Sequence, residues 1–183
     1  MDKPSPKISV KNEWCNIVLI GLMGAGKSSI GRKLATKLAL PFWDSDDEIE
    51  TISNCSIPEI FALYGEARFR ALEEIVIERL ISGPQHVLAT GGGAFMNKKI
   101  QAMIKKKAIS IWLKAGLETL IERTSRKKGR PLLDKGDPKL ILKDLMDKRY
   151  PIYSYADIIV ESADQPHQNM VNQIITAYSK LIG

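Results

Sequence analysis

A glycine-rich segment near the start of the chain has the residue types and spacing that bind nucleotide phosphates. It reads Gly-Leu-Met-Gly-Ala-Gly-Lys-Ser at residues 21–28, which fits the pattern G-x-x-x-x-G-K-[ST]. Glycines let backbone N–H groups point at phosphate oxygens, Lys27 can reach the β- and γ-phosphates, and the Ser28 hydroxyl can bind Mg²⁺. The expected ATP contacts are Gly24, Ala25, Gly26, Lys27, Ser28 and Ser29, with Ser29 packed beneath the loop.

A pair of carboxylates follows a second strand-like segment. Asp44 and Asp46 stand two residues apart where the segment 42–44 ends, and side chains with this spacing point to the same side of a strand. One carboxylate can hold Mg²⁺ through water while the other accepts a proton from a hydroxyl group. The alternative is the acidic first turn of a helix. We prefer this second interpretation for Asp47, Glu48 and Glu50.

Two arginines and three glycines have the chemistry to bind a second reactant. Arg70 and Glu73 are spaced i, i+3 on a predicted helix, so an arginine held by this glutamate could bind a carboxylate through two parallel hydrogen bonds. A surface salt bridge is the competing interpretation. Residues 91–93 are all glycine and follow a strand, which allows close approach of the backbone to a ligand but also fits a flexible turn. Arg149 ends a predicted helix, where a cation is favourable for local reasons.

A polar, basic and glycine-containing segment predicts a mobile lid at about residues 123–136. An arginine on a loop that closes over ATP would offset charge during phosphoryl transfer. Arg130 has this position and is a predicted catalytic residue. The two histidines, His86 and His167, have no partners at ligand spacing and are predicted to be structural.

Apolar runs of strand length alternate with segments of helical period along the chain. The predicted strands cover 16–20, 42–44, 86–90, 108–113 and 157–160, and the predicted helices cover 28–40, 57–81 with a break at Gly65, 97–107, 117–125, 137–150 and 166–181. This order predicts a three-layer α/β/α fold with a five-stranded parallel sheet. Because the carboxyl ends of parallel strands share one edge, the chemistry-bearing segments meet there. We expect a flexible tail at 1–12 and a single domain at 13–183.

The composition suits one globular domain and disfavours several classes of protein. The chain has 183 residues, 44% hydrophobic and 26% charged, near the globular average. No apolar run has the roughly 20 residues that cross a bilayer, and two cysteines cannot form a metal-ligand set. We therefore expect a cytoplasmic protein without membrane attachment. The net charge of +6 could attract nucleic acid, but the lysines at 98–107 have no nucleic-acid motif and no aromatic neighbours, so no such partner is predicted.

The order and spacing of these motifs together resemble the shikimate kinase family, from residue 16 to about residue 181. The matching segments are Gly-Leu-Met-Gly-Ala-Gly-Lys-Ser at 21–28, Asp-Ser-Asp at 44–46, Gly-Glu-Ala-Arg-Phe-Arg at 65–70, Gly-Gly-Gly at 91–93, Arg-Pro-Leu-Leu at 130–133 and Arg-Tyr-Pro-Ile-Tyr at 149–153. The first motif alone marks any P-loop NTPase. The resemblance implies a P-loop kinase fold with a mobile lid that phosphorylates the 3-hydroxyl of shikimate with ATP.

The resemblance also implies roles on the ATP side of the site. Lys27 and Ser28 would serve ATP and Mg²⁺, with Asp44 near the metal. Arg130 would contact ATP phosphates from the lid. Gln165, near the start of the last helix, looks like the residue beside adenine, with Arg123 as a second flanking residue. Ser29 stands where the family usually has threonine.

On the acceptor side, the resemblance implies that Asp46 binds the reacting hydroxyl and acts as the base. Arg70 and Arg149 would hold the shikimate carboxylate, and the Gly92 backbone, with Gly93 beside it, would contact the ring. The expected partners are therefore shikimate, ATP and Mg²⁺, and we expect a monomer.

Other kinds of protein stay open at this point. Gluconate kinases and nucleoside monophosphate kinases share the phosphate loop and the lid, although Arg70 and Arg149 suit a carboxylate-bearing acceptor. A kinase-like regulator without activity is disfavoured by the intact Lys27, Ser28, Asp46 and Arg130.

Overall fold

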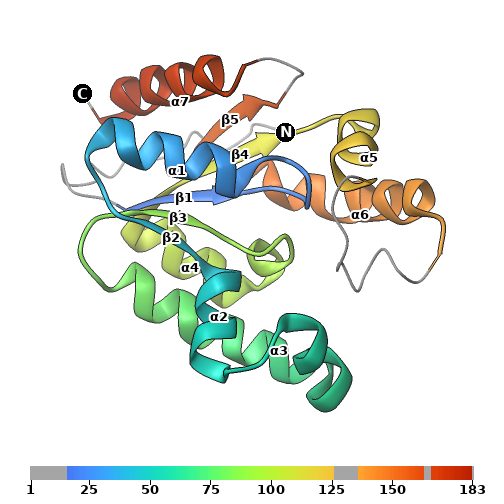
Figure 1. Cartoon of the computed structure of the whole chain (residues 1–183). Coiled ribbons are helices and arrows are strands. Elements are labelled where there is room, and N and C mark those ends of the chain that lie inside the picture. The colour runs from blue at the N-terminus through green and yellow to red at the C-terminus, as the bar shows by residue number, and fades with distance from the viewer. Residues whose placement is uncertain (1–15, 126–135, 163–165, 183) are drawn as a thin grey trace, which may run out of the picture.

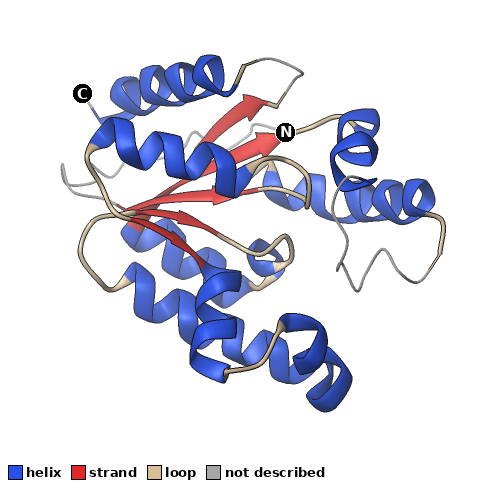
Figure 2. Cartoon of the chain, in the orientation of Figure 1, coloured by secondary structure: helices blue, strands red, loops and turns tan. Residues whose placement is uncertain are grey.

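A computed structural model of the chain describes residues 16–125, 136–162 and 166–182. In these residues five parallel strands form one sheet in the order β2-β3-β1-β4-β5. The strands are β1 (Asn16–Ile20), β2 (Phe42–Asp44), β3 (Val87–Ala89), β4 (Ala108–Lys114) and β5 (Ile158–Glu161). Figure 2 shows the arrows side by side and pointing the same way. The expected five-stranded parallel sheet is confirmed.

Helices cover both faces of the sheet, as Figure 1 shows. On one face α1 (Lys27–Leu38) packs against α7 (His167–Ile182), and on the other α3 (Ile57–Ile81) packs against α4 (Lys98–Lys107). The remaining elements are α2 (Ser45–Ser53), the 3-10 turn η1 (Ala94–Met96), α5 (Leu117–Ser125) and α6 (Pro138–Tyr153). The three-layer α/β/α arrangement is confirmed. None of the described helices has both the length and the apolar character that a bilayer crossing requires.

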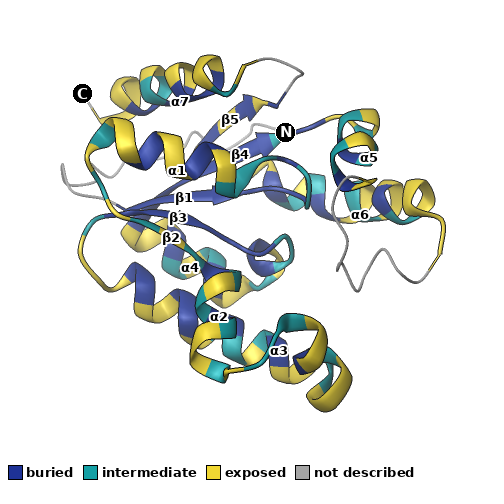
Figure 3. Cartoon of the chain, in the orientation of Figure 1, coloured by how far each residue is buried: buried dark blue, intermediate teal, exposed yellow. Residues whose placement is uncertain are grey.

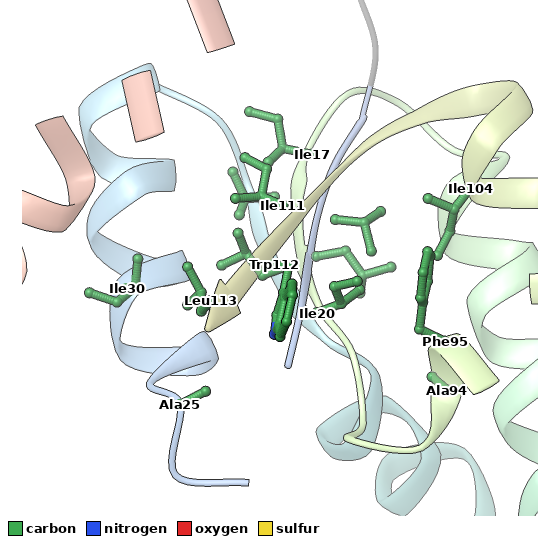
Figure 4. Close-up of a cluster of buried hydrophobic side chains, with 14 of the residues drawn as sticks. Ile17, Ile20, Ala25, Ile30, Ala94, Phe95, Ile104, Ile111, Trp112 and Leu113 are labelled. Carbon is green, nitrogen blue, oxygen red and sulfur yellow. The ribbon is translucent and has the colours of Figure 1, made fainter. Parts of the chain in front are cut away.

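The core lies on both faces of the central strands. All residues of β1 are buried, and they are apolar without alternation after Asn16, because both faces of a parallel sheet are covered by helices. Figure 3 shows this buried centre, and Figure 4 shows Ile30 of α1 on one side of the sheet and Phe95 and Ile104 on the other. Trp112 of β4 is also buried. A packed centre of this kind fixes where each strand ends, and therefore where the functional segments begin.

The helix α3 has a break in the middle, as expected from Gly65. Gly65 has φ 76° and ψ 171°, a conformation that only glycine adopts without strain. The helix starts with a capping box in which Ser56 and Glu59 exchange hydrogen bonds, which satisfies backbone groups at the helix end. The first half of α3 thereby projects from the sheet edge, and the second half packs beneath the sheet.

Three boundaries differ from the sequence-based expectation. The residues after Asp44 are helical at once, because the Asp44 carboxylate accepts a hydrogen bond from Asp46 N and caps α2. Helix α6 continues through Pro151 to Tyr153 instead of ending near residue 150, because Tyr153 is held in the core. Residues 123–125, at the expected start of the lid, belong to α5, whose expected bounds of 117–125 are confirmed. The expected tail at 1–12, most of the expected lid (126–135), Arg130 and Gln165 lie outside the described residues.

The packing of α1 on the sheet generates a stability prediction. A Cβ at Gly31 would stand 2.5 Å from a ring carbon of Phe42 and 3.1 Å from Leu19. Gly31→Ala should therefore lower the free energy of unfolding by about 1–3 kcal/mol, although alanine is the better helix former. Chemical denaturation measures this. Gly136→Ala, where a Cβ meets only Ile141 at 3.7 Å, is the control and should be near neutral; equal stability of both variants would contradict the packing argument.

Candidate active site

The phosphate loop leaves the central strand and leads into α1. Gly24 and Gly26 have positive φ values of 84° and 95°, which turn the backbone so that helix α1 can begin at Lys27. The Lys27 ammonium group donates hydrogen bonds to Gly21 O at 2.8 Å and Leu22 O at 3.0 Å. The lysine thereby lies across the mouth of the loop, where a helix N-terminus also attracts phosphate.

Ser28 and Asp44 bring two oxygen ligands together beside this loop. The Ser28 hydroxyl donates a 2.6 Å hydrogen bond to Asp44 Oδ2, and Asp44 Oδ1 accepts from Asp46 N at 3.1 Å. Hydroxyl and carboxylate oxygens are the ligands that Mg²⁺ prefers, usually together with water and substrate phosphates. Since no group of three or more His, Cys, Asp and Glu that could hold a metal occurs among the described residues, the pair fits an ion that is also bound by a nucleotide.

Asp46 lies at the first turn of α2 and not on a strand, so its direction comes from the helix and not from strand alternation. The pKa of Asp46 is raised to about 7, first by burial and then by the nearby charges of Asp44 and Glu73, against the opposing charge of Lys27. Its Oδ1 atom is buried without a hydrogen-bond partner among the described residues. Asp46 is thus a buried acid that can exchange a proton near neutral pH and has an unsatisfied acceptor at the cavity.

The glycine triplet at residues 91–93 packs directly against charged side chains. A Cβ on Gly91 would stand 2.8 Å from Asp46 Oδ1 and 2.7 Å from Glu73 Oε1. A Cβ on Gly93 would stand 2.5 Å from Arg70, and one on Gly92 3.4 Å from Arg149. The triplet is therefore not a plain flexible turn: larger residues would displace the carboxylates or the guanidinium groups.

Ser45 holds this triplet in place. Its hydroxyl accepts a 3.0 Å hydrogen bond from Gly91 N, and its side chain is fully buried. The start of α2 is thus tied to the end of β3. The sequence did not predict a role for Ser45, because a serine between two acidic residues does not by itself indicate a functional site.

Arg70 forms a buried ion pair rather than a surface salt bridge. It donates a 2.8 Å hydrogen bond to Glu73 Oε2, and the Glu73 side chain is only 1% exposed. A second carboxylate, Glu66, accepts from Arg70 at 3.1 Å. Burial raises the pKa of Glu73, although the charge of Arg70 opposes the rise. The guanidinium is held on two sides and lines the cavity.

Arg149 approaches the triplet from the last turns of α6. Its Nη1 atom donates a 2.9 Å hydrogen bond to Gly92 O. The Tyr153 hydroxyl donates to the same carbonyl in a short hydrogen bond. The pKa of Tyr153 is raised to about 12, mainly by burial, and the charge of Arg149 opposes the rise. Arg70 and Arg149 therefore flank the triplet from two different helices.

The phosphate loop, the two aspartates, the glycine triplet and the two arginines face one cavity of about 650 Å³ at the carboxyl edge of the sheet. Its lining residues are Met23, Gly24, Gly26, Lys27, Ser28, Ser29, Asp44, Asp46, Glu50, Ile57, Pro58, Phe61, Phe69, Arg70, Glu73, Thr90, Gly91, Gly92, Gly93, Arg123, Arg149 and His167. The cavity has one end at the phosphate loop and another at the arginines, beside the apolar residues of α3. It offers a phosphate site next to a site for a small acidic molecule.

Most of the predicted site residues that the structure describes meet in this cavity, with two corrections. Ser29 is exposed and lines the cavity, so it is not packed beneath the loop. Ala25 is buried, and its N–H donates to Leu22 O within the loop, so it is not brought to the cavity surface.

Other lining residues were missed or interpreted differently. The sequence predicts a structural role for His167, yet it lines the cavity at the start of α7. Arg123 lies there too and donates a 3.0 Å hydrogen bond to the Ser162 hydroxyl. The apolar lining residues Ile57 and Phe61 carry helical spacing only, which is the ordinary signal of a core position.

A phosphate loop at the end of a central strand, with a carboxylate pair and two arginines in the same cavity, defines a P-loop kinase that acts on a small molecule. Comparison with known proteins narrows this class. The sequence model described as shikimate kinase matches residues 23–179. Curated shikimate kinases are similar: one from Mesorhizobium japonicum is 48% identical over 92% of this chain and 83% of its own length, and one from Caulobacter vibrioides is 53% identical over 88% and 80%.

Solved structures agree with the sequence comparison. A shikimate kinase from Acinetobacter baumannii in complex with shikimate has a TM-score of 0.89 and 37% identity, covering 92% of this chain and 94% of its own. A gluconokinase from Sinorhizobium meliloti has a TM-score of 0.62 at 20% identity, covering 92% and 93%, which is a likeness of fold. The chain belongs to the shikimate kinase family.

The buried acid at residue 46 generates a prediction on pH and stability. An aspartate titrates near 3.8 when unfolded, and burial raises the pKa of Asp46 to about 7. The stability contributed by the neutral acid is therefore complete below about pH 4 and is lost as pH rises through 7. The side chain in Asp46→Asn stays neutral at every pH. The difference in unfolding free energy between this variant and the parent should therefore grow in favour of the variant by about 1–3 kcal/mol from pH 5 to pH 8.

Thermal unfolding of the ligand-free protein at both pH values measures this gain. Asp147→Asn, which changes an exposed carboxylate on α6 outside the cavity, is the matched control and should follow the parent. A variant-to-parent difference for Asp46→Asn that stays constant with pH would show that Asp46 ionises normally.

Proposed function

We propose that the chain transfers the γ-phosphoryl group of ATP to the 3-hydroxyl of shikimate, giving shikimate 3-phosphate and ADP. The observation that carries this proposal is the position of Lys27, Asp46 and the two arginines around one cavity. Family membership supports the choice of acceptor. A carboxylate-bearing alcohol needs cationic partners near its acid group and a base near its hydroxyl, and both are present.

The acceptor is proposed to bind between the glycine triplet and α3. Arg70 and Arg149 would hold its carboxylate, because guanidinium groups form paired hydrogen bonds with carboxylates. Gly92 and Gly93 would lie against the ring, which requires backbone without side chains at this point. The apolar side chains of Ile57, Phe61 and Phe69 supply a surface for the carbon face of the ring.

Asp46 is proposed to bind and deprotonate the reacting hydroxyl. The Asp46 side chain lines the cavity, so its carboxylate can accept the hydroxyl hydrogen, and a pKa near 7 suits proton transfer at neutral pH. The acceptor oxygen then attacks the γ-phosphorus while the bond between that phosphorus and the β–γ bridging oxygen breaks. The proton passes to Asp46, and ADP leaves with the electron pair of the broken bond.

The ATP side is proposed to use the phosphate loop and its neighbours. Gly24, Gly26, Lys27 and Ser29 line the cavity at this end, and Ala25 would contribute only through the loop that it helps to shape. Ser28 and Asp44 would hold Mg²⁺, directly or through water. When bound, Mg²⁺ would offset the charge of the phosphate oxygens.

Further proposals concern residues beyond the described ranges. Arg130, on a lid at about 123–136 within a single domain at 13–183, would contact the ATP phosphates and stabilise the transferring group. Gln165 would lie beside adenine together with Arg123, which lines the cavity. We also propose a cytoplasmic monomer without a nucleic-acid partner, because ATP and shikimate are small molecules that one cavity can hold.

A kinase for gluconate is the second candidate. The likeness to a gluconokinase supports a shared fold, and gluconate also carries a carboxylate beside hydroxyl groups. Comparing ADP release with shikimate, gluconate and nucleoside monophosphates separates the candidates. Turnover of gluconate without turnover of shikimate would overturn the main proposal.

Removing the proposed base should slow the chemical step. Asp46→Asn is expected to lower kcat by about 10²–10⁴-fold, because a general base typically contributes this much. The dissociation constant of ATP, measured by isothermal titration, should change less than about threefold, because Asp46 would contact the acceptor. Equal kcat values for the variant and the parent would remove the assignment of the base.

Weakening the proposed carboxylate contact should raise KM for shikimate. Arg70→Lys keeps the charge but loses the planar fork, so we expect KM for shikimate to rise about tenfold or more while KM for ATP stays near the parent value. Steady-state kinetics with each substrate varied in turn measure both constants. Lys143→Arg, a conservative change at an exposed residue of α6 outside the cavity, is the control. A rise in KM for ATP alone would contradict the proposed acceptor subsite.

A further inference from the structure

The last turn of α6 places a tyrosine behind the active-site cavity. Tyr153 is fully buried, and its ring packs against Trp112 with centroids 5.8 Å apart and against Phe95 at 6.4 Å. The helix reaches this residue although Pro151 interrupts its backbone hydrogen bonds. Tyr153 is not among the lining residues of the cavity, so it would not touch a bound acceptor.

Its hydroxyl group closes a small network with two groups that do line the cavity. The phenol donates to Gly92 O, and the nearby charge of the Arg149 guanidinium opposes the rise in the pKa of the phenol. Arg149 Nη1 donates to the same carbonyl at 2.9 Å. A carbonyl oxygen has two lone pairs, and two donors therefore hold Gly92 O. A guanidinium group held through one nitrogen keeps its remaining N–H groups for another partner.

The contacts of Arg149 affect how much entropy its side chain loses when it binds an anion. A free arginine side chain loses rotamer entropy when a ligand immobilises it. Arg149 is 9% exposed and already held by the Gly92 carbonyl. Most of this rotamer entropy is therefore already lost when the protein folds, before a ligand binds.

We propose that Tyr153 is a positioning residue for the acceptor: it orients the Arg149 guanidinium and the Gly92 backbone without touching the substrate. This inference rests on the proposed function, in which Arg149 binds the acceptor carboxylate. The competing explanation is that Tyr153 only fills the core. Both explanations predict that the ring matters, but only positioning predicts that the hydroxyl changes acceptor binding.

The variant Tyr153→Phe tests the role of the hydroxyl while keeping the ring. Gly92 O keeps its hydrogen bond from Arg149, so no buried carbonyl is left without a donor and the variant should fold. We expect KM for shikimate to rise about three- to tenfold, since one of the two hydrogen bonds that hold Gly92 O is lost. KM for ATP should stay within about twofold.

Tyr150→Phe is a matched control on the same helix. Its hydroxyl donates a short hydrogen bond to Ala115 O, and its ring packs against Trp112 at 4.8 Å. Tyr150 lies outside the cavity lining and does not contact Gly92 in any hydrogen bond of the described residues. We expect Tyr150→Phe to lose about as much unfolding free energy as Tyr153→Phe and to keep the parent KM for shikimate.

A double-mutant cycle with Arg149→Lys separates positioning from packing. If Tyr153 acts through Arg149, the effects of the two substitutions on KM for shikimate should not add. Once Arg149 has been replaced, the loss of the Tyr153 hydroxyl should change KM for shikimate little further. The methyl ester of shikimate is a second probe: the KM ratio of ester to acid should fall in Tyr153→Phe.

Three outcomes would overturn the inference: an unchanged KM for shikimate in Tyr153→Phe, equal KM effects in Tyr153→Phe and Tyr150→Phe, or strict additivity in the cycle. If the proposed function is wrong, the parent enzyme itself will not phosphorylate shikimate, and this result differs from all three outcomes above.

Discussion

The close packing of three backbone units without side chains, at residues 91–93, is the constraint on which the rest of the site depends. Two buried carboxyl groups meet the first glycine, and a guanidinium group meets each of the next two. The charged groups at Gly91 and Gly93 can approach the backbone this closely only because no Cβ intervenes, whereas a Cβ at Gly92 would be in ordinary contact with Arg149. The triplet is held from the other side by Ser45, through Gly91, and by Tyr153, through Gly92. A substrate in this position meets polar groups whose geometry is already set.

The electrostatics of the cavity follow from that packing. Burial raises the pKa of both Asp46 and Glu73, and the charge of Glu73 adds to the rise at Asp46. Lys27 and Arg70 oppose this rise from the two ends of the cavity. An acid that is costly to ionise in the folded protein is also one that readily accepts a proton, which links lower stability at neutral pH to the proposed chemistry.

Much of the fold could be predicted from local patterns. The buried run of β1, the break at Gly65 and the start of α6 at Asp137 and Pro138 are each determined by neighbouring residues. Predictions were wrong where a distant contact outweighed a local signal. The helix was expected to end near residue 150, but packing of Tyr153 against Trp112 extends α6. The acidic run after β2 was divided between two interpretations, and both apply, because Asp44 caps the helix that carries Asp46.

The order of residues alone determined the phosphate loop, the alternation of strands and helices, and the types of side chain available for catalysis, because each depends on neighbours along the chain. Only the tertiary structure decided whether Arg70 lies at the surface or pairs with buried Glu73, and whether His167 and Ser29 reach the cavity. It also decided that Arg149 and Tyr153 meet at one carbonyl, that of Gly92. The physical reason is that burial and pairing depend on groups far apart in sequence, which meet only when the parallel strands bring their carboxyl ends to one edge.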